Sequence, residues 1–277
     1  MTAILSWFHR GANTIPYLMT VGDTKINAGD KTLTLEGAKI LELPIKCKDY
    51  TTIHQELYFS SSIGYSFAGS SLIGLSVYCY LQALLSNLGG VKQKNNLPDY
   101  KSICFKAKEV LALYAKSIQS PCEILVFGYC PKSKIPFIST IRPVKREGTI
   151  DYDIEFNDYF DNDLDFFIIG DKQEEIRKLV SNELQKQTNK NSLPYWRTPA
   201  RILRDVIEGR SFNTIGGNLQ IATINMYKFD MYSVPIPVKG LGNESTIKFR
   251  NFDIFDDIGI NLGECLIAIN GMMIDPE

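Results

Sequence analysis

Thr2 is the residue whose type and position could most directly do chemistry in this sequence. It follows the initiator methionine, and removal of Met1, which a small second residue permits, would give it a free α-amine. A threonine hydroxyl is a weak nucleophile near neutral pH and needs an adjacent base. The α-amine, with an ordinary pKa of about 7.7–8.0, is such a base on the same residue. The sequence therefore offers a candidate nucleophile that carries its own base.

Other chemical motifs are incomplete or absent. The acidic segment 151–165 suggests a calcium loop, but Phe166 and Lys172 stand where that loop needs glycine and glutamate, so we expect a solvated loop. The cysteines form no CxxC pair, and His9 and His54 are far apart, so no zinc site is expected. The sequence has no GxxxxGK[ST], GxGxxG or GxSxG motif. We therefore expect neither a metal nor an organic cofactor.

The composition is that of an ordinary globular protein. Hydrophobic residues make up 44% of the 277 residues, and the formal net charge is -1. Without a basic excess, neither nucleic acid nor an anionic membrane is an expected partner. The most apolar run, residues 70–90, carries Ser76 and Gln82, and we interpret it as a buried helix rather than a membrane span. The N-terminus lacks the basic segment of a secretory signal, so we expect a cytoplasmic protein with reduced thiols.

The elements that must position Thr2 follow from the hydrophobic pattern. It predicts strands in blocks and helices in pairs between them, which favours an α+β fold over a doubly wound parallel sheet. We expect a four-layer αββα sandwich, in which helix pairs cover two stacked antiparallel sheets. Residues 1–277 are expected to form a single domain with a C-terminal extension from about residue 238. The expected strands are 2–8, 14–21, 39–43, 62–69, 123–128, 136–141, 165–169, 218–226, 232–238 and 265–270, and the expected helices begin after Gly69 and cover 100–117, 172–186 and 198–208.

Three segments resemble the first third of proteasome β subunits and the related bacterial two-component ring proteases. They are Val-Gly-Asp-Thr at 21–24, Glu-Gly-Ala-Lys-Ile at 36–40 and Ile-Gly-Tyr-Ser-Phe-Ala-Gly-Ser at 63–70. In that family an N-terminal threonine opens the first strand and an aspartate follows the second. A lysine begins a later strand, and a small-residue step precedes the first helix. The resemblance extends more weakly through 127–129, 168–171 and 214–219, and covers roughly residues 2–225.

The resemblance implies an N-terminal nucleophile hydrolase, a threonine-type peptidase. Thr2 would be the nucleophile, and Lys39 the cation that favours loss of its hydroxyl proton. Asp23 would pair with Lys39, and the backbone N–H of Gly69 would stabilise the oxyanion. Asp171 would accept a hydrogen bond from the threonine amine. The implied partners are a peptide or protein substrate, further copies of the chain in a ring, and an unfoldase or regulator.

Departures from the family pattern keep an alternative open. A serine commonly stands where this chain has Asp171, and the usual aspartate–serine pair is replaced by residues 211–215, where Asn213 and Thr214 fit only with a shifted register. A retained Met1 would also block the amine. These features favour a catalytically inactive, proteasome-like structural or binding subunit. A further alternative is an α+β sandwich unrelated to this family, and a fold without two stacked antiparallel sheets would exclude both family interpretations.

Overall fold

The computed structural model has an α+β fold built on antiparallel sheets, and it describes residues 2–10, 15–29, 31–146, 149–160, 164–237 and 245–274. Met1 and residues 161–163 of the acidic segment lie outside these ranges. Within the described ranges, no group of three or more His, Cys, Asp or Glu side chains could hold a metal ion. None of the helices described is long and apolar enough to cross a membrane.

The N-terminal strand lies inside a five-stranded sheet with the order β11-β1-β2-β12-β13. All neighbouring strands in this sheet pair antiparallel. Strand β1 is buried along almost its whole length, as its continuous apolar run predicts. Thr2 therefore stands directly before a buried strand with a neighbour on each side. The strands are β1 (Ala3–His9), β2 (Tyr17–Asp23), β11 (Phe166–Gly170), β12 (Leu219–Ile224) and β13 (Phe229–Tyr232).

A second, six-stranded sheet has the order β10-β9-β8-β6-β5-β7. Its strands pair antiparallel except for the parallel pair β5–β7. A separate hairpin of β3 (Ile26–Ala28) and β4 (Lys31–Thr34) follows β2. The strands of the second sheet are β5 (Ile40–Asp49), β6 (Leu57–Gly69), β7 (Leu88–Gly90), β8 (Cys122–Tyr129), β9 (Pro136–Arg146) and β10 (Thr149–Asn157).

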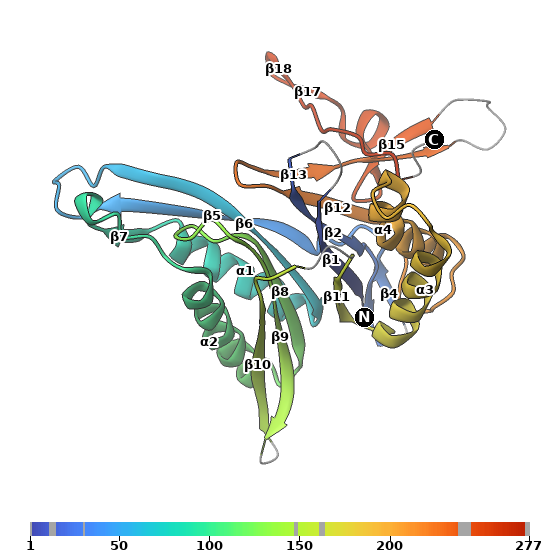
Figure 1. The fold of residues 1–277 in the computed structure, drawn as a ribbon, viewed down its shortest axis with the longest axis horizontal. Helices are drawn as coiled ribbons and strands as arrows, with labels where there is room; N and C mark the ends of the chain where they lie inside the picture. Colours follow the sequence, from blue (N-terminus) through green and yellow to red (C-terminus); the bar gives the residue numbers. More distant parts are fainter. Residues whose placement is uncertain are drawn as a thin grey trace.

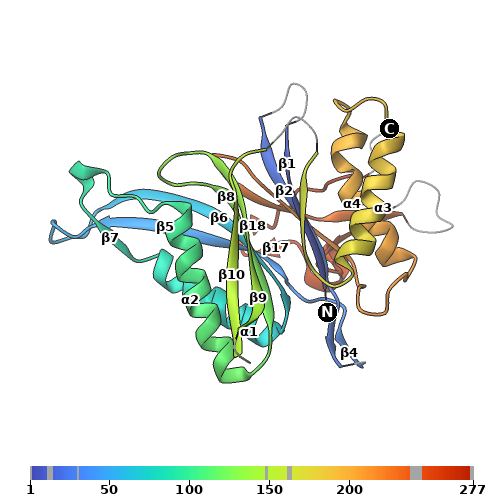
Figure 2. The ribbon, with the colours of Figure 1, turned by 60° about the horizontal axis from the view of Figure 1, so that its bottom comes forward.

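A pair of helices lies beside each sheet, as Figures 1 and 2 show. Helices α1 (Ser71–Leu85) and α2 (Tyr100–Ile118) share a core cluster with the second sheet, and a short 3-10 turn (Lys92–Lys94) lies between them in sequence. Helices α3 (Gln173–Lys186) and α4 (Leu193–Glu208) share a second cluster with the first sheet.

The two sheets also share a core. One apolar cluster joins Ile4 and Ala222 of the first sheet to Leu125 and Phe127 of the second. Because side chains alternate along a strand, Ile4 faces the second sheet while Ala3 and its odd-numbered neighbours face α3 and α4. The even-numbered residues of β1 therefore lie on the face between the two sheets. Thr2, directly before the strand, continues this even-numbered series.

Helix α1 is only half buried, which corrects the expectation of a buried helix. Ile73, Val77 and Leu81 are fully buried against the sheet, one stripe at helical spacing. Leu72 and Tyr80 lie on the other side and are 64% and 50% exposed. Apolar residues lie on more than one side of this helix, but the sheet covers only one stripe of it.

The C-terminal region returns to the first sheet. Strands β14 (Val234–Pro237), β15 (Ser245–Phe249) and β16 (Phe252–Asp253) form a small antiparallel sheet. A turn of π-helix (Ile254–Ile258) and the pair β17 (Asn261–Leu262) and β18 (Cys265–Leu266) follow, so only the first part of the expected strand 265–270 is present. Met272 and Ile274 then join the cluster beneath α4.

Two predicted boundaries along β2 and β5 are wrong. Gly22 and Asp23, which lie beyond the end of the expected strand 14–21, are the last residues of β2. The strand expected to close before Pro44 runs on to Asp49. Proline has no N–H to donate, but β7 pairs with β5 only from Cys47 onward, so Pro44 has a strand neighbour, β6, on one side alone.

The solvated loop expected over 151–165 is also wrong in its first half. Residues up to Asn157 belong to β10, where acidic and apolar side chains alternate. Tyr152 is fully buried on one face, while Asp151 and Asp153 pair with Arg146 on the other. The number of charges in the segment obscured this period-two pattern, which is the signal of a half-buried strand.

Helix α4 begins earlier than expected, at Leu193 rather than Thr198. The Ser192 side chain accepts a hydrogen bond from the Tyr195 N–H, and Pro194 lies in the first turn, where its missing N–H costs nothing. These residues are the usual signals of a helix start.

Candidate active site

Thr2 lies at the point where β1 meets β11. It is 4% exposed, and its carbonyl oxygen accepts a hydrogen bond of 2.6 Å from the Asp171 N–H. The next residue, Ala3, pairs with Gly170 across the two strands. The threonine is therefore fixed by backbone contacts on the β11 side.

Gly170 makes this close approach possible. Its φ is +100°, a conformation that residues with a side chain rarely adopt. A Cβ atom built on it would lie 1.9 Å from the Thr2 carbonyl oxygen. A side chain of any size at position 170 would therefore displace the backbone of Thr2.

We expect Gly170→Ala to destabilise the protein and disturb the Thr2 backbone. The φ alone costs about 1–3 kcal/mol in the free energy of unfolding, and the contact with Thr2 adds to it. Urea denaturation measures the loss. Gly29→Ala is the matched control, because Gly29 also has a positive φ (+59°) but nothing lies within 4 Å of its Cβ position. Equal losses in the two variants would contradict the close contact.

The Asp23 side chain accepts hydrogen bonds from three parts of the chain, one of which is the Thr2 segment. Its Oδ1 accepts the Ala3 N–H at 3.0 Å, and its Oδ2 accepts the N–H groups of Gly216 at 3.1 Å and Lys25 at 3.2 Å. The side chain is fully buried. These donors satisfy a carboxylate that would otherwise be costly to bury.

Lys39 is the charged partner of Asp23. Its Nζ lies 3.1 Å from Asp23 Oδ1 and donates to the Lys25 carbonyl oxygen at 2.5 Å. The residue is 1% exposed. Burial raises the pKa of the Asp23 carboxyl and lowers the pKa of the Lys39 ammonium, while the attraction between them opposes both shifts. One carboxylate oxygen thus binds both the ammonium and the peptide N–H that follows Thr2.

Gly69 and Thr2 both line a small pocket. The pocket has a volume of about 180 Å³. Gly69 has a φ of +105°, and a Cβ there would lie 2.8 Å from the Pro121 carbonyl oxygen. Asp23 and Lys39 do not line the pocket; the contact of this pair with the Thr2 segment is the hydrogen bond from the Ala3 N–H to Asp23 Oδ1. The lining residues are Thr2, Ala68, Gly69, Pro121, Cys122, Glu123, Pro143, Gly170 and Asp171.

Asp171 lines the same pocket and has a partner from a distant loop. The Thr214 hydroxyl donates to its Oδ2. Thr214 was expected to substitute for a family residue only with a shifted register, and the structure places it in contact with Asp171. The five residues singled out in the sequence, Thr2, Asp23, Lys39, Gly69 and Asp171, are thus brought into one region.

Sequence reasoning missed Gln220, which supports Lys39. Its Oε1 accepts the N–H groups of Lys39 at 3.1 Å and Ile40 at 3.3 Å, and its Nε2 donates to the Gly37 carbonyl oxygen at 2.7 Å. It is 2% exposed. A lone amide within the apolar strand β12 was the available signal, since buried polar groups require partners.

Glu123 was missed as well. Its Oε2 accepts the Gly170 N–H at 3.0 Å and a hydrogen bond of 3.2 Å from Gln173 Nε2. Burial raises the pKa of its carboxyl. A charged residue at the start of the apolar strand β8 was the signal. With Asp171 it gives the pocket two carboxyl groups and no basic lining residue.

The fold is similar to that of solved proteasome-like N-terminal nucleophile hydrolases. One such structure is a Gly-1 mutant of Anbu from Hyphomicrobium sp. strain MC1. The TM-score is 0.51 and the sequences are 14% identical, over 83% of this chain and 84% of that one. No protein-family model and no curated protein sequence matches the chain. At this identity the likeness concerns the fold alone.

Proposed function

We propose that the chain is a threonine-type amide hydrolase of the proteasome-like class, with a four-layer αββα fold and with Thr2 as nucleophile once Met1 is removed. One observation carries the proposal. Asp23 Oδ1 binds both the Lys39 ammonium and the Ala3 N–H, so a buried cation is held beside the peptide that follows Thr2. A solvent-exposed lysine, or an aspartate that only stabilises a turn, would not form these buried contacts.

The proposed reaction uses Thr2, Gly69 and Asp171, which line the pocket, and Lys39, which does not. The Thr2 hydroxyl oxygen forms a bond to the carbonyl carbon of an amide, and its proton passes to the Thr2 α-amine. The Gly69 N–H stabilises the oxyanion, and Lys39 stabilises charge near the nucleophile. The carbon–nitrogen bond then breaks, and the leaving amine takes the proton from the α-ammonium. Asp171 orients the amine.

Deacylation uses the same groups in reverse. Water adds to the acyl-enzyme ester and gives its proton to the α-amine. The ester bond breaks, and the proton returns to the Thr2 oxygen. No cofactor is needed in either half of the reaction.

The rate of hydrolysis is expected to depend on pH with two limbs. The base must be the neutral amine, so the rate should rise as pH passes the amine pKa, ordinarily about 7.7–8.0. Because burial lowers the pKa of Lys39, its cation is lost at a pH below the ordinary value of about 10.4, and the rate should fall there. The pH dependence of kcat/KM on a fluorogenic peptide measures both limbs. A rate that keeps rising to pH 11 would contradict the role of Lys39.

We further propose a peptide or protein substrate and a homo-oligomeric ring, with an unfoldase or regulator as a possible additional partner. The resemblance in sequence motifs supports these assignments, and so does the apolar outer face of α1. Leu72, Leu75 and Tyr80 on that face are between 39% and 64% exposed. Sedimentation velocity of the purified protein tests the assembly.

The mass of the intact protein purified from its native host tests the proposed function first. Loss of Met1 alone exposes the Thr2 amine, and a peptide epoxyketone should then modify the chain once. The epoxyketone is informative because it reacts with a hydroxyl and an amine on the same residue. Retained Met1 in every molecule would remove the base and contradict the hydrolase.

An inactive structural or binding subunit is the second candidate. The observation that favours it is Asp171, which stands where the family commonly has a serine and adds a carboxyl group to a pocket that already contains Glu123. Asp171→Ser separates the two candidates. A gain of hydrolysis in this variant, with none in the parent, would favour the scaffold.

A further inference from the structure

A larger pocket lies at the other end of the first sheet. It has a volume of about 730 Å³, within the size range of small-molecule sites. Its walls come from the start of β2, the β12–β13 turn, α4 and the C-terminal segment. Tyr17 begins β2 and Asp23 ends it, and because a strand rises about 3.3 Å per residue, the two residues lie roughly 20 Å apart. This pocket is therefore separate from the Thr2 site.

Arg197 supplies the unbalanced charge of this pocket. One Nη donates to the Met273 carbonyl oxygen. Its Nε is buried and has no hydrogen-bond partner among the described residues, and no carboxylate in the described ranges forms an ion pair with it. The other two charged lining residues, Lys228 and Asp230, pair with each other at 2.7 Å. The lining thus has one net positive charge and an unused guanidinium donor.

Among the described residues, the two aromatic rings that interact electrostatically with Arg197 add no negative charge. Burial raises the pKa of Tyr17 to about 12, so its phenol is neutral at physiological pH. His9 stacks on the Tyr17 ring with centroids 4.4 Å apart, and burial lowers its pKa to about 4, so it is neutral as well. Nothing in these two rings competes with an external anion for the guanidinium.

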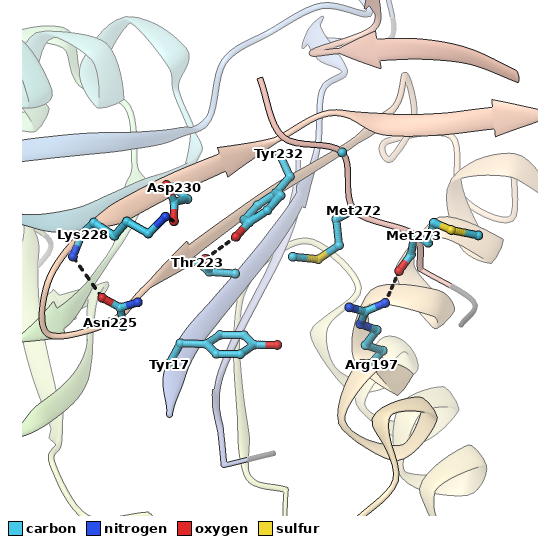
Figure 3. A pocket seen from close by; sticks show the side chains of 10 residues that line it. Tyr17, Arg197, Thr223, Asn225, Lys228, Asp230, Tyr232, Met272 and Met273 are labelled. Carbon is cyan, nitrogen blue, oxygen red and sulfur yellow. Dashed lines mark hydrogen bonds and ion pairs between the residues drawn. The ribbon is translucent and has the colours of Figure 1, made fainter. Parts of the chain in front are cut away.

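The rest of the lining is apolar or neutral. Figure 3 shows Tyr17, Tyr232 and Met272 gathered around the space beside Arg197. The Tyr232 hydroxyl and the Thr223 hydroxyl are already 3.3 Å from each other. A ligand that fits this pocket therefore needs one anionic group to bind the Arg197 guanidinium. It also needs an apolar body to pack against the tyrosine rings and the Met272 thioether.

We propose that this pocket binds a small organic carboxylate, with the carboxylate on Arg197 and the apolar body against Tyr17 and Met272. A planar carboxylate can accept two parallel N–H bonds from one guanidinium, and this geometry suits the single arginine. A phosphate would present more charge than one arginine balances and no apolar surface for the walls. The pocket thus gives the protein a second, small-molecule site.

Calorimetric titration with phenylacetate tests the proposal, with phenylacetamide and inorganic phosphate as comparison probes. We expect phenylacetate to bind, and the neutral amide and phosphate to bind at least about tenfold more weakly. Arg197→Met should weaken phenylacetate binding at least about tenfold. Arg201→Met is the matched control: it lies one turn further along α4, pairs with Glu183 and should leave binding unchanged.

A second variant covers the case in which Arg197→Met fails to fold. Met273 is 63% exposed at the pocket mouth, so Met273→Trp should fill the opening without disturbing the core, and it should abolish binding. Thr2→Val should bind phenylacetate as the parent does, whether or not the chain is a hydrolase. No binding to the parent, equal binding of phenylacetamide, equal binding of phosphate, or unchanged binding in the folded Arg197→Met variant would each overturn the proposal.

Discussion

Lys39→Met is expected to lower the free energy of unfolding by about 3–5 kcal/mol and to abolish hydrolysis. The methionine keeps the length of the side chain but leaves the Asp23 carboxylate buried without its cation. Asp23 is fully buried and Lys39 is 1% exposed, so solvent cannot replace the missing partner. Chemical denaturation measures the stability, and a fluorogenic peptide measures the activity.

A double variant separates the two effects. Asp23→Asn with Lys39→Met removes both charges and leaves an amide that can still accept the Ala3 N–H. We expect it to lose clearly less stability than the sum of the two single variants, because neither charge is left alone. Hydrolysis should stay lost. Lys106→Met is the surface control, since Lys106 is half exposed in its ion pair with Glu109 and such pairs contribute little. A Lys39→Met loss below about 1 kcal/mol would contradict the buried pair.

Thr2→Val should remove hydrolysis, by a factor on the order of 10³ or more, with little change in the fold. Valine has the shape of threonine without its hydroxyl, and it is small enough for Met1 to be removed. The Thr2 contact that the structure records is made by its backbone carbonyl with the Asp171 N–H, which valine preserves. The measurement is kcat/KM on the same peptide, together with the intact mass of each variant.

Thr2→Ser is the matched control for that experiment. Serine keeps a hydroxyl and an α-amine on one residue, so it should retain part of the activity. Equal hydrolysis by the parent and Thr2→Val would show that Thr2 is not the nucleophile. These experiments test different parts of the site. The variants of Thr2 should change the rate of hydrolysis at nearly constant stability. The variants of Asp23 and Lys39 should change both the rate and the stability.

The pocket that Thr2 lines requires a specific backbone conformation at two distant glycines. Gly69 and Gly170 both have positive φ values and both bring backbone into the pocket that Thr2 lines. They come from different sheets, which the inter-sheet core holds together. The stability of that core therefore sets how accurately the pocket is built, a link that the Gly170→Ala prediction addresses.

Much of the architecture was predictable because its signals are local. The apolar runs that form β1 and β12, the serine before α1 and the two helix pairs all follow from periodicity and capping within a few residues. The α+β class follows from the order of these elements. The predictions were wrong where contacts with other elements decide the structure. Pro44 is tolerated in β5 because β7 does not pair with that part of the strand. Residues 149–157 form a strand because the Tyr152 side chain packs into the core.

The sequence by itself determined the candidate nucleophile, since Thr2 and its α-amine are adjacent by covalent bonding. Through its resemblance to proteasome β subunits, the sequence also indicated Asp23, Lys39, Gly69 and Asp171. Only the tertiary structure decided their contacts, because Asp23 binds Gly216 from 193 residues away and Lys39 is supported by Gln220 from 181 residues away. The pocket around Arg197 has the same origin. The residues that line it are far apart in sequence. Whether a charge is buried or a donor is unpaired depends on the surrounding residues, which only the folded structure brings together.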